Sequence, residues 1–152
     1  MNDSIKWTLK KFYDLSPSEL YSIMQLRNEV FVVEQNCVFQ DADDKDQDSY
    51  HFTGWLNEKL VAYARLLPSE IDHNDYIFIG RVVTSPSVRG SGIGKELMLR
   101  SIEQINNLFG IVSIRISAQL YLKNFYAEFG FKQTSNIYTE DGIEHIEMIR
   151  PQ

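Results

Sequence analysis

A glycine-rich turn between a strand and a long helix constrains this chain more than any other feature of its sequence. Residues 76–84, YIFIGRVVT, are β-branched or aromatic on both faces, which is typical of a central strand. The turn that follows reads Arg89-Gly90-Ser91-Gly92-Ile93-Gly94 and leads into Lys95. An apolar stripe at helical spacing comes next, at Leu97, Ile102, Ile105 and Leu108. The sequence therefore predicts a strand, a tight turn and a helix in succession.

This turn has the chemistry to hold a pyrophosphate. Its glycines let backbone N–H groups face one point, and the helix adds unpaired N–H groups and the positive end of its dipole. Arg89 and Lys95 add positive charge. The Walker A pattern is not met, because Arg89 and Glu96 stand where it needs Gly and Ser or Thr. The Rossmann fingerprint also fails, since Lys95 replaces its last glycine. Taken alone, the turn also fits a helix entry that binds nothing.

The other elements predict one mixed α/β domain over residues 1–152. Ser16, Pro17 and Glu19 form a capping-box pattern at the start of a helix, and Asp141-Gly142 suits the turn of a closing hairpin. Helices are also expected after the glycine-rich turn and over 122–129, and a loop over 68–75. Strands are expected at 5–12, 51–56, 60–67, 76–84, 111–117, 131–138 and 143–150. This order predicts helices packed on a single sheet of about seven strands.

Composition narrows the class of protein. The chain has 152 residues, with 43% hydrophobic and 24% charged, which fits an ordinary globular domain. Its net charge of −6 disfavours nucleic acid as a partner and favours a cationic one, such as an amine. No apolar run approaches the ~20 residues of a spanning helix, and the N-terminus lacks a signal-like apolar core, so we expect no membrane partner. The single cysteine, Cys37, makes no internal disulfide, and a cytoplasmic location is expected.

An aspartate-rich segment over residues 41–48 raises the question of a metal. An EF-hand that starts at Asp44 would need Gly at position 49 and an acid at position 55, where Ser49 and Trp55 stand. We therefore expect no metal. The segment is interpreted as a solvated loop, or alternatively as an acidic collar in which Asp43 and Asp46 attract a cationic amine.

Two motifs together resemble the GNAT superfamily of acyl-CoA N-acyltransferases. Arg89-x-x-Gly92-x-Gly94 is similar to the family's acyl-CoA loop, and Tyr126 stands four residues before Gly130-Phe131, as in its second signature. Three segments resemble the ElaA-type subfamily: residues 26–35 (LRNEVFVVEQ), Gly80-Arg81-Val82 and the final hairpin, residues 140–145 (EDGIEH). The resemblance implies a mostly antiparallel mixed sheet flanked by helices. It also implies an acetyl-CoA-dependent N-acetyltransferase, a monomer or homodimer, whose acceptor is a primary amine of a small molecule or of a peptide or protein.

The resemblance also implies roles for individual residues. Tyr126 is expected to donate a proton to the departing CoA thiolate, since a phenol stays protonated at neutral pH. The backbone of Val82 and Val83 is expected to pair with the pantetheine arm, and the N–H of Val83 to face the thioester oxygen. The cofactor-binding set is completed by Arg89, Gly90, Ser91, Gly92, Ile93, Gly94, Lys95, Gln119 and Asn124. Gln119 departs from the Asn that many members carry there.

The general base and the acceptor site are less defined by sequence. Glu34 and His51 are the candidate bases, and each also fits a structural role as a helix-end acid or a strand hydrogen-bonder. Arg27, Phe31 and Arg81 are the candidate acceptor-binding residues, and Arg81 could instead pair with Glu34 or with an aspartate of the acidic segment. Cys37 is expected to be a free thiol.

Two other functions remain open at this stage. The first is an acyltransferase that uses another acyl donor, such as an acyl-carrier protein. The second is a non-catalytic acyl-CoA sensor, which the presence of Tyr126 disfavours.

Overall fold

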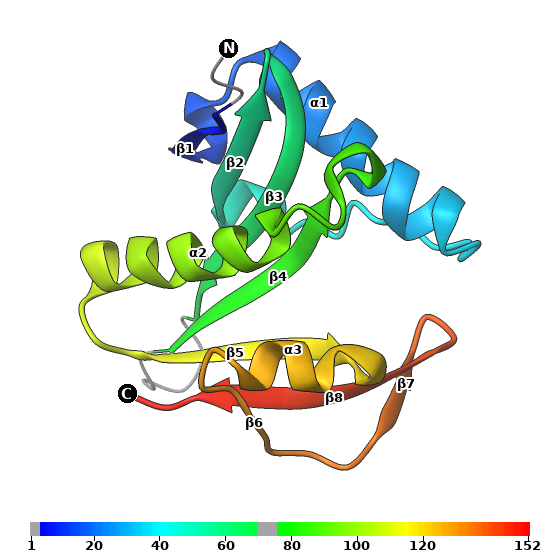
Figure 1. The fold of residues 1–152 in the computed structure, drawn as a ribbon, viewed down its shortest axis with the longest axis vertical. Coiled ribbons are helices and arrows are strands. Elements are labelled where there is room, and N and C mark those ends of the chain that lie inside the picture. The colour runs from blue at the N-terminus through cyan, green and yellow to red at the C-terminus, as the bar shows by residue number, and fades with distance from the viewer. Residues whose placement is uncertain (1–3, 70–75) are drawn as a thin grey trace.

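The computed structural model describes residues 4–69 and 76–152, which form one mixed sheet of eight strands (Figure 1). The strand order is β1-β2-β3-β4-β5-β8-β6, with β7 paired to β8, and only β4 and β5 run parallel. The strands are β1 (Lys6–Lys11), β2 (Tyr50–Leu56), β3 (Lys59–Pro68), β4 (Tyr76–Thr84), β5 (Ser113–Gln119), β6 (Lys132–Gln133), β7 (Tyr138–Glu140) and β8 (Ile143–Arg150). The expected mixed, mostly antiparallel sheet is confirmed.

Helices cover both faces of this sheet. They are α1 (Pro17–Arg27), α2 (Ile93–Phe109) and α3 (Lys123–Ala127). Alternation along β3 sends Ala62, Ala64 and Leu66 into the core beneath α2 and α3, whereas Tyr63 points to the opposite face and packs with Ile23 of α1. Figure 1 shows α2 lying across the strands and α3 running along β5 and β8. Within the described residues, no helix is both long and apolar enough to cross a membrane.

The chain closes with two short strands where the sequence predicts a single strand at 131–138. Lys132–Gln133 (β6) and Tyr138–Glu140 (β7) both pair with β8, at opposite ends of it. The hairpin turn at Asp141-Gly142 is confirmed: both residues have positive φ, as a two-residue type I′ turn requires. Strand β3 extends to Pro68, and the rest of the loop expected at 68–75 lies mostly outside the described residues.

The first helix begins with the capping box that the sequence predicts. The Ser16 side chain accepts from the Glu19 backbone N–H, and the Glu19 carboxylate accepts from the Ser16 N–H. Directly after α1, the chain continues as a π-helical segment, Asn28–Glu34. π-Helical turns are rare in proteins, and those that do occur are often found at functional sites. Here the segment carries Phe31 and Glu34 to the wall of the cavity described below.

Strand β4 pairs with β5 over only three residues and then separates from it. Beyond this point, β4 has a bulge in its pairing with β3. Pairing of β4 with β5 is limited to residues 76–78 and 113–115. Against β3, the register shifts so that Ala64 faces both Arg81 and Val82. Arg81 has φ +50°, a backbone conformation that costs about 1–3 kcal/mol in a non-glycine residue and is concentrated at functional sites. The two strands therefore splay apart and leave a wedge between them.

Candidate acyl-CoA site

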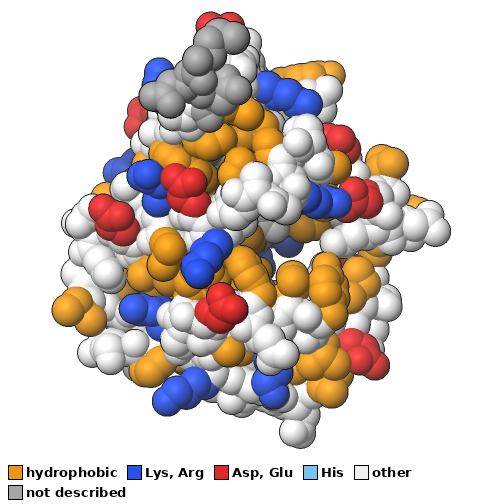
Figure 2. Space-filling view, in the orientation of Figure 1, with side chains coloured by type: hydrophobic (Ala, Val, Ile, Leu, Met, Phe, Trp, Pro, Cys, Tyr) orange, Lys and Arg blue, Asp and Glu red, His pale blue; other side chains and the backbone are white. Residues whose placement is uncertain are grey.

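A cavity of about 910 Å³ occupies the wedge between β4 and β5. Figure 2 shows the surface hollowed between the half of the molecule that carries α2 and the half that carries α3. The wall includes the bulged part of β4, the end of β5, α3, the π-helical segment and the β7–β8 turn. Because β5 no longer pairs with β4 beyond Phe78, this edge of β4 is available to another extended chain.

The glycine-rich turn forms one end of this cavity. Gly90 and Gly92 have φ of +82° and +84°, which L-residues rarely adopt, and a Cβ on either would meet no atom within 4 Å. Gly92 caps α2, so the first N–H groups of a 17-residue helix point out of the turn. The Ser91 hydroxyl is already used, because it donates to the carbonyl oxygen of Val88.

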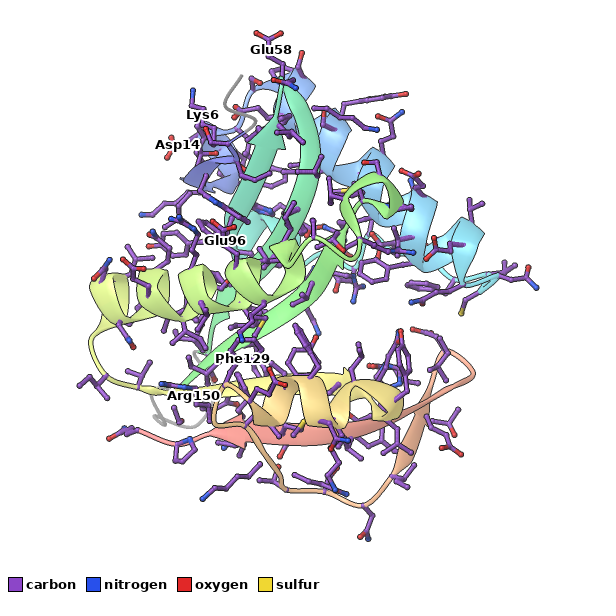
Figure 3. The ribbon with its side chains drawn as sticks, viewed as in Figure 1. Lys6, Asp14, Glu58, Glu96, Phe129 and Arg150 are labelled. Atoms are coloured by element: carbon purple, nitrogen blue, oxygen red, sulfur yellow. The ribbon has the colours of Figure 1, made fainter. Side chains whose placement is uncertain are left out.

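The acidic residue in the first turn of α2 is directed away from the glycine-rich turn. Figure 3 labels Glu96 on the side of α2 that faces β1. Its carboxylate accepts from the indole N–H of Trp7 at 3.2 Å and from Nε of Arg100 at 2.9 Å. These two donors offset the negative charge that would otherwise oppose an anion at this helix end.

Tyr126 of α3 lies in the wall with its hydroxyl unengaged. The side chain is buried, with 7% of the residue exposed, and the described residues provide no hydrogen-bond partner for its oxygen. Burial, with a smaller contribution from Tyr121, raises the pKa of Tyr126 to about 12. The phenol therefore keeps its proton throughout the neutral range and can donate it into the cavity.

Comparisons with known proteins agree with this architecture. The family model described as an acetyltransferase (GNAT) domain matches residues 15–150. The chain belongs to the GNAT acetyltransferase family. Protein ElaA of Escherichia coli is 44% identical over 148 residues, which cover 96% of both chains.

Solved GNAT structures extend the comparison. The crystal structure of Escherichia coli ElaA matches 96% of this chain and 99% of its own with a TM-score of 0.90. An acyl-CoA N-acyltransferase from Pseudomonas aeruginosa is 42% identical, with a TM-score of 0.91 over 97% of this chain and 99% of its own. A GNAT acetyltransferase from Elizabethkingia anophelis with acetyl-CoA bound shares the fold, at 15% identity and a TM-score of 0.66 over 99% and 100% of the two chains. Together these findings support an acyltransferase enzyme.

Within the GNAT fold, an ion pair links the π-helical segment to the glycine-rich turn. The Glu34 oxygens lie 2.7 and 2.9 Å from the two terminal nitrogens of Arg89, and both side chains are about two-fifths exposed. Glu34 is therefore a paired helix-end acid, which is one of the two roles that the sequence leaves open. Its partner is the first residue of the acyl-CoA loop motif.

Asp41, Asp43 and Asp46 of the acidic segment are paired with arginines, which contradicts its interpretation as a solvated loop at these positions, whereas Asp44 and Asp48 are exposed. Asp41 and Asp46 are 6% and 4% exposed. Arg27 lies 2.6 Å from Asp41 and 2.7 Å from Asp46, and Arg65 lies 2.8 Å from Asp43 and 3.0 Å from Asp46. Burial alone would raise the pKa of Asp43, but hydrogen bonds and charge from Arg65 outweigh it and lower that pKa to about 2. These carboxylates are thus not free to form the proposed collar.

The same network shows that Arg27 is not an acceptor-binding residue, and it accounts for the position of Arg81. Arg27 is fully buried and does not line the cavity, because its guanidinium is bound by Asp41 and Asp46, which do not line it either. Arg81 does line the cavity, and its Nε lies 2.8 Å from Asp41 Oδ1. The alternative that Arg81 pairs with the acidic segment is confirmed. The Arg81–Asp41 ion pair connects the bulged part of β4 to this segment.

The geometry contradicts the prediction that His51 is a candidate general base. It is fully buried, does not line the cavity, and uses both ring nitrogens. Nε2 lies 2.8 Å from the Asp46 carbonyl oxygen and Nδ1 lies 2.7 Å from the Tyr63 hydroxyl. Since a carbonyl only accepts, Nε2 donates to it and Nδ1 accepts from Tyr63. Burial lowers the pKa of His51, so the ring stays neutral and acts as a structural hydrogen-bonder.

The structure gathers about half of the sequence-predicted residues around the cavity. Those in its wall are Phe31, Glu34, Arg81, Val82, Val83, Arg89, Gly94, Gln119 and Tyr126. Those outside the wall are Arg27, His51, Gly90, Ser91, Gly92, Ile93, Lys95 and Asn124. Most of the second group belongs to the glycine-rich turn and the start of α2.

Several wall residues were not predicted as site residues. His145 and Glu140 line the cavity from the β7–β8 hairpin, and Gln35 accepts from the Gln119 side chain at 3.4 Å. Cys37 is a free thiol, as expected, and donates to the Asp141 carbonyl oxygen at 2.9 Å. The only signal in the sequence was the likeness of the final hairpin to the ElaA type, which marks a segment and not a role.

Proposed function

We propose that this GNAT enzyme transfers an acetyl group from acetyl-CoA directly to a primary amine, with Tyr126 as the general acid for the CoA thiolate. The observation that supports it best is the buried, unengaged hydroxyl of Tyr126 in a cavity that opens between β4 and β5. A thiolate leaving group needs a proton or a hydrogen bond, and this phenol holds its proton at neutral pH.

In this proposal the cofactor enters along the open edge of β4. The pyrophosphate would lie on the N–H groups of the glycine-rich turn, with Arg89 and Lys95 supplying charge. The pantetheine arm would pair with the backbone of Val82 and Val83 as a replacement for β5, and the Val83 N–H would donate to the thioester oxygen. A neighbour with the same fold has acetyl-CoA bound, which supports this choice of donor.

The acceptor is proposed to be a cation, because the chain carries a net charge of −6 and the β7–β8 hairpin places Glu140 and Asp141 in the cavity wall. Glu34 and Asp43 lie in the same wall, but they are paired with Arg89 and Arg65. Direct attack needs no covalent enzyme intermediate, and the Cys37 thiol is already engaged by a backbone carbonyl.

Isothermal titration with acetyl-CoA tests the cofactor part of the proposal. Gly92→Glu is expected to abolish binding, because the new carboxylate occupies the open side of the turn and repels phosphate. Gly110→Glu is the matched control: it adds the same charge at the other end of α2, at a glycine with φ +78° and equally open surroundings. Equal binding by wild type and Gly92→Glu would contradict the proposed site.

An amine screen then tests transfer. Thiol release from acetyl-CoA in the presence of small primary amines is expected for wild type. Intact acetyl-CoA binding with no thiol release from any amine would favour the non-catalytic sensor, and release from longer acyl-CoA donors alone would favour a different acyl donor.

A further inference from the structure

His145 presents one ring nitrogen to the cavity and has the other fixed by the backbone. The residue is 8% exposed and lies in the cavity wall on β8. Its Nδ1 lies 2.8 Å from the carbonyl oxygen of Ile143. Because a carbonyl oxygen only accepts, Nδ1 carries a proton in the neutral ring, and Nε2 is left with its lone pair.

A carboxylate faces that lone pair. Glu140 Oε2 lies 3.4 Å from His145 Nε2, and both residues belong to the wall. When the ring is neutral, two acceptors therefore face each other without a proton between them. Such an arrangement is stabilised by a donor that carries positive charge, either a proton on Nε2 or an ammonium group that bonds to both atoms.

Neighbouring side chains hold both groups in place. The Ser117 hydroxyl donates to Glu140 Oε2 at 3.2 Å and is hydrogen-bonded in turn to the Tyr138 hydroxyl. The Tyr138 ring stacks on the His145 ring, with centroids 6.1 Å apart and an interplanar angle of 21°. The hairpin of β7 and β8 thus orients both side chains, of which that of His145 is buried and that of Glu140 is half exposed.

No other base in the wall is similarly placed. Glu34 is held by Arg89 at 2.7 Å, and the Cys37 thiol donates to a carbonyl. Apart from the arginines and Tyr126, the other titratable side chains in the wall are those of Lys45, Tyr121, Asp141 and Asp43, and Asp43 is held by Arg65 at 2.8 Å. Of the two histidines among residues 4–69 and 76–152, only His145 lines the cavity.

We propose that His145 is the general base for the acceptor amine and that, together with Glu140, it forms the receptor for the amine's ammonium group. The inference rests on the proposed function.

The ammonium donates to Nε2 and to the Glu140 carboxylate, and Nε2 then takes one proton. The freed lone pair attacks the thioester carbon, so that a C–N bond forms and the C–S bond breaks. The thiolate takes the Tyr126 proton, the second proton lost by nitrogen restores Tyr126, and His145 returns its proton to solvent.

Ring-nitrogen NMR of uniformly ¹⁵N-labelled protein tests the geometry without turnover. Neutral His145 is expected as the Nδ1–H tautomer, whereas His51 is expected as the Nε2–H tautomer and serves as an internal control. His145→Asn keeps a donor toward Ile143, lacks the Nε2 base, and assigns the signals by their loss. Butylammonium added with CoA is expected to shift the Nε2 signal of His145. An Nε2–H tautomer, or no response to butylammonium, would overturn the proposal.

Thiol-release kinetics with two acceptors test the role in transfer. Butylamine is a cation at neutral pH, and hydroxylamine is a neutral nucleophile. His145→Asn is expected to lower kcat/KM for butylamine by about 10²-fold, the usual size of general-base catalysis, and to affect hydroxylamine much less. Glu140→Gln is expected to raise KM for butylamine more than for hydroxylamine. An equal loss with both acceptors would overturn the proposal. Failure of wild type to transfer to any amine would count against the proposed function. The NMR response to butylammonium would still test whether His145 and Glu140 bind an ammonium group.

Discussion

Glu34 and Arg89 neutralise each other across the mouth of the cavity, through two contacts of 2.7 and 2.9 Å. One belongs to the π-helical segment and the other is the first residue of the glycine-rich turn. In the proposed complex, a pyrophosphate would compete with the Glu34 carboxylate for the same guanidinium. Cofactor affinity is then set partly by the strength of this ion pair.

Glu34→Gln is accordingly expected to tighten acetyl-CoA binding by about 5-fold, the upper range for loss of an exposed ion pair. Arg89→Gln is expected to weaken binding by about 10-fold. Titration calorimetry measures both. Glu103→Gln, an exposed position on α2, makes the same change in net charge and is expected to leave the affinity unchanged. Weaker binding by Glu34→Gln would show that the carboxylate does not compete.

Tyr126→Phe removes only a hydroxyl that has no partner among the described residues. We expect kcat to fall by about 10²-fold, with the acetyl-CoA Kd and the Tm close to wild type, because the buried ring remains. Tyr121→Phe is the matched control, since this neighbouring wall residue is 74% exposed. A kcat near wild type for Tyr126→Phe would remove it as the general acid.

Asp46 holds two buried arginines at once, which makes it a stability determinant. Removing its charge leaves Arg27 and Arg65 short of a partner, and Asp46→Asn is expected to cost about 3 kcal/mol in the free energy of unfolding. Asp48→Asn, at an exposed position in the same segment, is expected to change it by less than about 0.5 kcal/mol. Urea denaturation measures both, and equal values would show that burial of this network contributes little.

His51 makes stability depend on pH. Burial lowers its folded-state pKa below the unfolded value of 6.5, so its contribution is present above pH 6.5 and is lost as the pH falls below it. The Tm of wild type is therefore expected to drop between pH 8 and pH 5.5. In His51→Gln, which keeps a donor toward the Asp46 carbonyl, this drop is expected to be smaller. The same drop in both proteins would assign the effect to other groups.

Local patterns were enough to predict several elements of the fold. The capping box at Ser16 and the turn at Asp141-Gly142 each depend on a few neighbouring residues, and both are confirmed. The glycine-rich turn and the Tyr126 signature are likewise short-range, and their likeness to GNAT motifs indicated the family. Within these elements the bounds shifted by a few residues, and one expected strand became β6 and β7.

Partners across the fold were decided by tertiary structure alone. The sequence shows arginines far apart along the chain and a run of aspartates, but only the packing of α1, β3 and β4 brings Arg27, Arg65 and Arg81 to the same cluster of carboxylates. Likewise, His51 and His145 are both strand histidines in the sequence. The first is fully buried and does not line the cavity, whereas the second lies in its wall, because the β4–β5 splay opens space beside β8 and not beside β2.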